Sequence, residues 1–154
     1  MRVLVVVLLV LALTGPAAPA SPASPRPKVR TDVVEGLAVL HRWDERRALA
    51  WASTDERALR SLYLPGSAAA QSDVSLLRAY TARGLVVRRM VTQVFGVVVL
   101  RRDPDRLVLR VRDRVAGGIV VDHGREVALP STRPVVRRLE LRLVGGAWRL
   151  VSGG

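Results

Sequence analysis

The sequence predicts an α+β domain in which N-terminal helices pack on a curved antiparallel β-sheet. Apolar residues recur at helical spacing in the first half of the chain, whereas from Leu85 onward they occupy every second position. Helices followed by a run of strands form a layered fold with one sheet face covered and the other exposed. The 154 residues suit one domain, and 49% hydrophobic content without cysteine indicates a core that needs no disulfides.

The first twenty residues have the pattern of a signal peptide. A basic start precedes the apolar run Val3–Leu13, and the small residues Ala18 and Ala20 have the spacing that signal peptidase reads, which favours cleavage before Ser21. The apolar run is shorter than the ~20 residues of a spanning helix. We therefore expect residues 1–20 to be removed and the protein to be secreted, with an uncleaved N-terminal membrane anchor as the alternative.

Residues 21–30 are rich in proline and serine and predict an extended linker, which leaves residues 31–154 as the folded domain. In that domain Thr31-Asp32 has the composition of a helix N-cap. A helix is expected from there to Ser53, and a short second helix over about 56–63 with Thr54 or Asp55 as its cap.

A turn is predicted at Leu64–Ser67, where Ser67 is interpreted as a helix cap rather than a nucleophile. The third helix follows, with a possible break near Ser72-Asp73, and ends at Gly84, which is typical of a helix C-terminus.

Strands account for the rest of the chain. One long strand or two are expected over 85–101 with a bulge at Gly96, then strands at 106–121, 127–129, 135–144 and 147–151. Gly117-Gly118 should bend the second strand, and Gly145-Gly146 is typical of a tight hairpin. One face of the 106–121 strand is predicted to hold Leu107, Leu109, Val111, Val115, Ile119 and Val121, and the other Arg106, Arg110, Arg112 and Arg114.

This order of motifs over about residues 31–151 resembles the nuclear transport factor 2-like superfamily. The resemblance rests on a long first helix followed by Ser53-Thr54-Asp55, on the Leu62–Ser67 turn, and on the closing hairpin at Gly145–Leu150. It implies the cone-shaped fold shared by ketosteroid isomerases, scytalone dehydratase and polyketide cyclases. Members commonly hold a pocket between the curved sheet and the helices, and the chain is most similar to exported bacterial members.

Two carboxylates fall on apolar faces. Asp44 lies in the apolar arc of the first helix and Asp113 interrupts the inward series of the second strand, so each needs a partner. Candidate partners are Arg47, Arg137, Tyr63, Tyr80 and His41, and the residues expected to line a pocket are Leu40, Trp43, Tyr63, Tyr80, Val111 and Arg137. Asp44 and Asp113 are either general acids or bases with raised pKa values, or structural groups paired with arginine or tyrosine.

Three functions follow from these interpretations. We favour a non-enzymatic module that binds a small apolar ligand or a cell-envelope partner. The alternatives are an isomerase or dehydratase that uses an inward Asp44 or Asp113, and a structural accessory domain with a filled core. An open cavity of several hundred Å³ that reaches an inward acid would favour ligand binding or catalysis.

The net charge of +12 predicts weak affinity for anionic surfaces. Nucleic acid is not expected as a partner, because aromatic residues are too few for a stacking platform. No cofactor is expected, and His41 and His123 lack the spacing of a metal site. The arginines of the outer sheet face, namely Arg106, Arg110, Arg112, Arg114, Arg138 and Arg142, are expected to repel a second copy of that face.

Overall fold

Three helices precede five strands in the computed structural model, which describes residues 27–153. The helices are α1 (Pro27–Ala52), α2 (Glu56–Ser61) and α3 (Ala68–Thr81), and the strands are β1 (Leu85–Arg102), β2 (Arg106–Asp122), β3 (Arg125–Leu129), β4 (Val135–Val144) and β5 (Ala147–Gly153). The expected signal peptide and residues 21–26 of the expected linker lie outside the described residues. Among residues 27–153, no helix is long and apolar enough to span a membrane.

The first helix begins earlier than its sequence suggested. It starts at Pro27, so it includes the last four residues of the expected linker, and Thr31 and Asp32 lie inside the helix rather than at its cap. Proline is tolerated in the first turn of a helix, because the N–H that it lacks would have no partner there. The helix ends at Ala52, next to the stop expected at Ser53.

The caps of the two shorter helices are confirmed. The Asp55 carboxylate accepts a hydrogen bond from the Ala58 N–H at 2.9 Å, and the Ser67 hydroxyl accepts one from the Ala70 N–H at 3.2 Å. The third helix has no break at Ser72-Asp73 and runs to Thr81, just before Gly84 with its φ of +71°. Each helix of the pair is therefore fixed at its start by a side chain.

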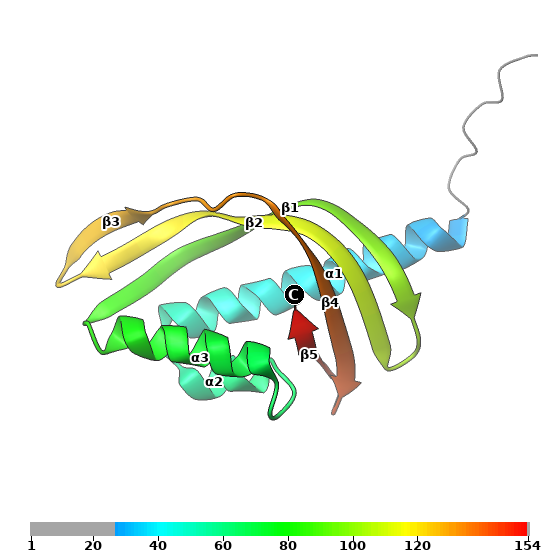
Figure 1. Cartoon of the computed structure of the whole chain (residues 1–154), viewed down its shortest axis with the longest axis horizontal. Helices are drawn as coiled ribbons and strands as arrows, with labels where there is room; N and C mark the ends of the chain where they lie inside the picture. Colours follow the sequence, from blue (N-terminus) through cyan, green and yellow to red (C-terminus); the bar gives the residue numbers. More distant parts are fainter. Residues whose placement is uncertain (1–26, 154) are drawn as a thin grey trace, which may run out of the picture.

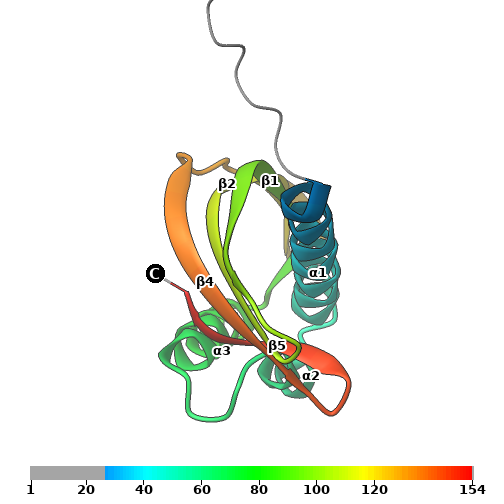
Figure 2. The ribbon, with the colours of Figure 1, turned by 90° about the vertical axis from the view of Figure 1, so that its right-hand side faces the viewer.

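The sheet is antiparallel and is built around β2. One edge of β2 pairs with β1 along its length, and the other edge pairs with β4 in its first half and with β3 in its second half, while β5 pairs with β4. Figure 1 shows the sheet arching over the helices, and Figure 2 shows α1 alongside β1. The concave face therefore looks toward the helices and the convex face away from them.

Bulges and glycines bend the long strands. A register shift between Val94 and Gly96 confirms the bulge expected there, and a second irregularity between Arg88 and Val91 contains Arg89 with a φ of +52°. The hairpin at Gly145-Gly146 is also confirmed, with φ values of +59° and +76° that favour glycine.

The prediction of which β2 residues face inward is correct only for the first half of the strand. Leu107, Leu109 and Val111 are buried in the core. Beyond Gly117, which has a φ of +155°, Val120 packs against the core opposite Val87. The expected inward positions Ile119 and Val121 do not, because the bend at the glycines changes which alternate residues face the helices.

Position 118 should require glycine, because the backbones of β1 and β2 approach each other closely there. A Cβ at Gly118 would lie 3.2 Å from both the Arg88 carbonyl oxygen and the Met90 Cα, whereas a Cβ at Gly96 would meet nothing within 4 Å. We expect Gly118→Ala to lower the free energy of unfolding by about 1–3 kcal/mol and Gly96→Ala to change it little. Urea unfolding of both variants tests this, and equal midpoints would contradict it.

Candidate functional site

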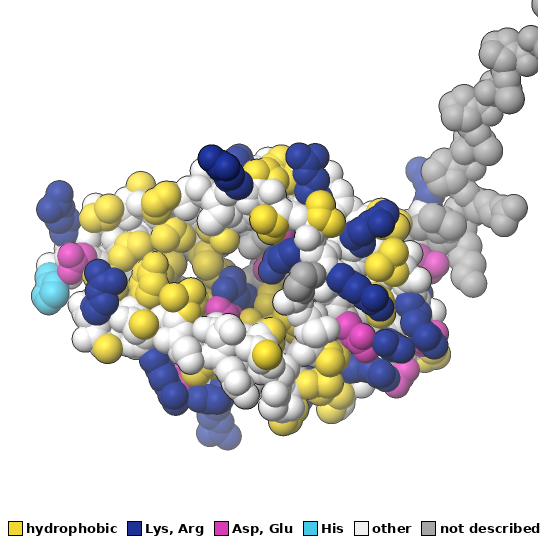
Figure 3. Space-filling view, viewed as in Figure 1, with side chains coloured by type: hydrophobic (Ala, Val, Ile, Leu, Met, Phe, Trp, Pro, Cys, Tyr) yellow, Lys and Arg dark blue, Asp and Glu magenta, His cyan; other side chains and the backbone are white. Residues whose placement is uncertain are grey.

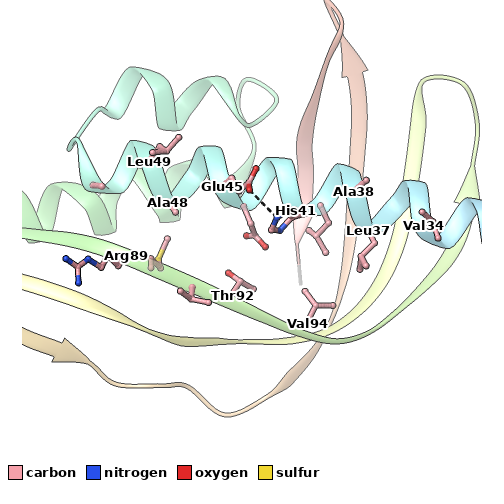
Figure 4. A pocket seen from close by; sticks show the side chains of 15 residues that line it. Val34, Leu37, Ala38, His41, Glu45, Ala48, Leu49, Arg89, Thr92 and Val94 are labelled. Carbon is pink, nitrogen blue, oxygen red and sulfur yellow. Dashed lines mark ion pairs between the residues drawn. The ribbon is translucent and has the colours of Figure 1, made fainter.

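Two pockets adjoin α1. The first, which we call the α1–β1 groove, has a volume of about 1030 Å³, and Figure 4 shows side chains of α1 and β1 on its two sides. Its lining residues are Val34, Leu37, Ala38, Leu40, His41, Asp44, Glu45, Ala48, Leu49, Ala52, Arg89, Met90, Val91, Thr92 and Val94. Most of them are apolar, and they come from successive turns of one helix and from the irregular stretch of one strand.

The second pocket, which we call the sheet pocket, lies between the concave sheet face and helices α1 and α3. It has a volume of about 490 Å³, and its charged lining residues are Asp44, Arg47, Asp73, Asp113, Arg114 and Arg137. In Figure 3 basic and acidic side chains are visible in the hollow between the sheet and the helices. The space between sheet and helices is therefore open, and charged groups lie within it.

Asp113 is a paired, structural carboxylate. It is 1% exposed, and the Arg137 guanidinium binds it at two points: Nε donates to Oδ1 at 3.0 Å and Nη2 donates to Oδ2. This bidentate arrangement gives the buried charge the partner that it needs. Of the two roles open to Asp113 from the sequence, the structure supports the structural one.

Asp73 is buried like Asp113, and none of the sequence predictions names it as a site residue. Arg47 donates to both of its oxygens, from Nε at 2.7 Å and from Nη2 at 2.6 Å, while the Tyr63 hydroxyl donates at 2.6 Å and Trp51 Nε1 at 3.3 Å. The signal was present, because Asp73 shares the helical stripe of the buried residues Ala70, Val74 and Leu77. The serine-aspartate pair was instead interpreted as a break in the helix.

The same contacts shift the pKa values of the partners of Asp73. Burial alone would lower the pKa of Arg47, but the hydrogen bonds and negative charge of Asp73 outweigh burial and raise it. Burial raises the pKa of the Tyr63 hydroxyl, and the Asp73 charge raises it further. Both groups therefore stay protonated, and the network holds α1, the turn and α3 together.

Asp44 differs from the other two carboxylates. Within residues 27–153 no basic side chain forms an ion pair with it, because Arg47 is bound to Asp73 and Arg137 to Asp113. Burial raises the pKa of Asp44 from 3.8 to about 6, although the positive charges of Arg47 and Arg137 act in the opposite direction. Asp44 and Thr92 line both pockets, so a carboxyl group with a pKa near neutral lies where the two pockets meet.

The other residues expected to line a pocket lie in the α1–β1 groove, in the sheet pocket or in the core. Leu40 lines the α1–β1 groove, and Trp43, Tyr63 and Arg137 line the sheet pocket. Val111 and Tyr80 line neither pocket, which corrects the sequence interpretation. Val111 is fully buried in the core, and Tyr80 packs edge-on against Trp51 at 5.6 Å between ring centroids.

The candidate partner His41 and the pocket residue Trp43 both bind groups other than Asp44. His41 lies on the exposed side of the groove, where its Nε2 pairs with Glu45 at 3.1 Å (Figure 4). Trp43 Nε1 donates to the Leu62 carbonyl at 2.9 Å, and its ring meets Tyr63 edge-on. In the described part of the chain, no three His, Cys, Asp or Glu side chains are grouped so that they could hold a metal ion.

Comparison with known proteins establishes the fold. No family model matches the chain, and no curated protein matches it significantly. Among solved structures, the intermembrane space region of the chloroplast protein ARC6 is similar with a TM-score of 0.54 and 17% identity, over 84% of this chain and 97% of that one. The protein Aln2 from a Streptomyces species has a TM-score of 0.50 and 15% identity, over 84% of this chain and 90% of that one.

A protein of unknown function from Mycobacterium tuberculosis is also similar, with a TM-score of 0.51 and 12% identity over 78% of this chain and 74% of that one. The chain therefore shares with these three structures the α+β fold in which N-terminal helices pack on a curved antiparallel sheet, as its sequence predicts. At these identities the likeness concerns the fold alone.

The raised pKa of Asp44 should make stability depend on pH. Because the folded protein holds the Asp44 proton more tightly than the unfolded chain, its stability falls as the pH rises from about 4 to about 6 and does not recover above that. Asp44→Asn lacks this titration. We expect the variant to gain up to about 3 kcal/mol relative to the parent between pH 4 and pH 7 in urea unfolding.

Asp113→Asn is the matched control, because it removes a carboxylate that is paired. Loss of this charge leaves the half-exposed Arg137 guanidinium without its hydrogen-bond partner and should lower stability by about 1–3 kcal/mol at pH 7. A stability difference between Asp44→Asn and the parent that stays constant over this pH range would contradict the assignment of Asp44. Unchanged stability of Asp113→Asn would contradict the structural role of Asp113.

Proposed function

We propose that this protein is a non-enzymatic module that binds a small apolar ligand in the α1–β1 groove. The observation that carries the proposal is an open, mostly apolar space of about 1030 Å³ that reaches a partly buried carboxyl group. Ligand pockets are typically apolar, with a few polar groups that fix orientation, and have volumes of up to about 1,000 Å³. A domain with a filled core would have no such space beside α1.

Exposed apolar side chains along the groove support the same proposal. Val34 and Leu49 are each 68% exposed and Val91 is 55% exposed. Covering such surface contributes about 25 cal/mol per Å². A ligand that lies along α1 would bury these side chains, and the groove therefore favours an elongated apolar molecule over a compact polar one.

Asp44 would give the ligand its orientation. It is the carboxyl group shared by both pockets, and its pKa of about 6 lets it accept a hydrogen bond as a carboxylate or donate one when protonated. We infer that the ligand carries one hydroxyl, carbonyl or amine group near its middle, and that the rest of its surface is apolar.

Filling the groove should weaken binding. Ala48 lines the groove in the middle of α1, whereas Ala79 is an exposed residue of α3 that lines neither pocket. We expect Ala48→Phe to weaken binding of the neutral fluorophore N-phenyl-1-naphthylamine at least about tenfold, because the ring takes the space of the ligand. Ala79→Phe should bind as the parent does.

Circular dichroism of both variants would establish that they are folded. Equal affinity of Ala48→Phe and the parent would contradict the proposal, as would a parent that binds no fluorophore. Native mass spectrometry of the protein purified from its own host would then reveal a retained molecule and its mass.

The pKa of Asp44 also favours a second candidate, an isomerase or dehydratase. A carboxylate with a pKa of about 6 inside an apolar space can take a proton from the carbon next to a ligand carbonyl and return it to another position. This candidate predicts deuterium exchange into cyclic ketones in D₂O, measured by NMR, that Asp44→Asn abolishes. Absence of exchange with the parent protein would leave binding as the function.

We further propose that the protein acts outside the cytoplasm, after removal of residues 1–20, and that an envelope protein is the alternative occupant of the groove. The leader pattern of the sequence supports export. The intact mass of the protein recovered from its host distinguishes a chain that begins at Ser21 from one that keeps its N-terminal anchor.

A further inference from the structure

The convex face of the sheet carries a concentration of positive charge. We call it the outer face, and it comprises Phe95, Val98 and Leu100 of β1, Arg106, Arg110, Arg112 and Arg114 of β2, and Val136, Arg138, Glu140 and Arg142 of β4. Six of these residues are arginine and one is acidic. The α1–β1 groove shares no residue with the outer face, so the outer face is independent of the proposed function, and Arg114 at its edge also lines the sheet pocket.

Two pairs of arginines lie directly opposite each other across β2 and β4. Arg106 faces Arg142, and Glu140 compensates this pair with contacts at 2.9 Å to Arg106 and 3.5 Å to Arg142. Arg110 faces Arg138, and within residues 27–153 neither forms an ion pair with a carboxylate. Like charges directly opposite on neighbouring strands are unfavourable, and an anion bound between Arg110 and Arg138 would relieve their repulsion.

Apolar side chains alternate with these arginines. Val136 is 62% exposed, Leu100 47%, Phe95 46% and Val98 45%. Val98 is opposite Arg110 and Val136 is opposite Arg112 in the strand register, so apolar and basic groups share the same rows. The guanidinium groups of Arg112 and Arg114 each lie 5.6 Å from the Phe95 ring centre, which forms a basic and aromatic cluster at the bulge of β1.

We infer that the outer face docks on an anionic lipid bilayer. Arg110, Arg112 and Arg138 contact lipid phosphates, while Phe95, Val98 and Val136 enter the interface between headgroups and acyl chains. An anionic bilayer interacts favourably with both the arginines and the apolar side chains, because its headgroups attract basic groups and its acyl chains bury apolar ones. A soluble polyanion would satisfy the arginines and leave the apolar side chains in water, and a second copy of the face would bring like charges together.

Charge variants test the docking surface on vesicles of phosphatidylglycerol and phosphatidylcholine. We expect the triple variant Arg110→Gln/Arg112→Gln/Arg138→Gln to reduce co-sedimentation affinity at least about tenfold, since each basic residue near an anionic surface contributes several-fold. The control Arg42→Gln/Arg46→Gln/Arg57→Gln removes the same charge from exposed helix positions. It should reduce affinity less than about threefold, and equal losses in the two triple variants would overturn the inference.

A fluorescence reporter tests which face meets the lipid, independently of how residues 1–26 behave. Phe95→Trp should increase the quenching of tryptophan fluorescence by brominated lipid in the same vesicles relative to the parent and its three tryptophans, whereas Leu76→Trp should not. Leu76 is 50% exposed on α3, away from the outer face, so it is a matched position. An equal increase in quenching at both positions, or an increase at neither, would overturn the inference.

Phe95→Ala separates a bilayer from a soluble polyanion. The variant keeps every arginine, so its affinity for polyphosphate should equal that of the parent, while its affinity for the vesicles should fall about three- to tenfold. If Phe95→Ala changes neither affinity and the arginine variant loses both, the outer face binds a polyanion and the bilayer is excluded. Circular dichroism establishes that each variant is folded.

Discussion

Three acidic side chains, Asp44, Asp73 and Asp113, lie near only two guanidinium groups beneath the sheet, and the described structure depends on which of them form ion pairs. Arg47 is bound to Asp73 and Arg137 to Asp113, and each pair joins elements that are distant in sequence: α1 to α3, and β2 to β4. Buried charges of this kind are tolerated only when paired, so one contact fixes α1 against α3 and the other fixes β2 against β4. Asp44 is the carboxyl group left over, and its raised pKa follows from that arrangement of its neighbours.

Periodicity along the chain was sufficient to predict the class of fold, because burial of one face imposes a spacing of 3.6 on helices and 2 on strands. It identified Asp44 and Asp113 as inward and named Arg137 among the candidate partners, and the structure pairs Asp113 with Arg137. Periodicity did not identify Asp73 as a buried site, because a serine-aspartate pair is equally typical of a break in a helix. What distinguishes the two is Arg47, which lies 26 positions away in sequence.

The prediction that Ile119 and Val121 face inward is wrong because of a backbone bend in β2. Alternation assumes that every residue of a strand advances the chain by one pleat, but a glycine with a positive φ such as Gly117 interrupts it. Beyond that point Val120, rather than Ile119, faces the core. The start of α1 was misplaced because capping patterns are local, whereas a helix continues wherever its backbone geometry is allowed, as it is at Pro27. Side-chain partners and backbone bends both lie beyond what local spacing can specify.

The same alternation that covers one face of the sheet leaves the other face free to differ in chemistry. On the concave side, charged groups lie close to buried residues such as Leu109 and Val111, so they need an ion-pair partner. Asp44, at the edge of the apolar groove, is the exception. On the convex side, arginines need no partner for folding, because water solvates them. The absence of an ion pair therefore has a different energetic meaning for Asp44, which is partly buried, than for Arg110 and Arg138, which are exposed. The unpaired Asp44 is unfavourable for the folded protein, whereas Arg110 and Arg138 are only mildly unfavourable, so their significance depends on the exposed apolar side chains beside them.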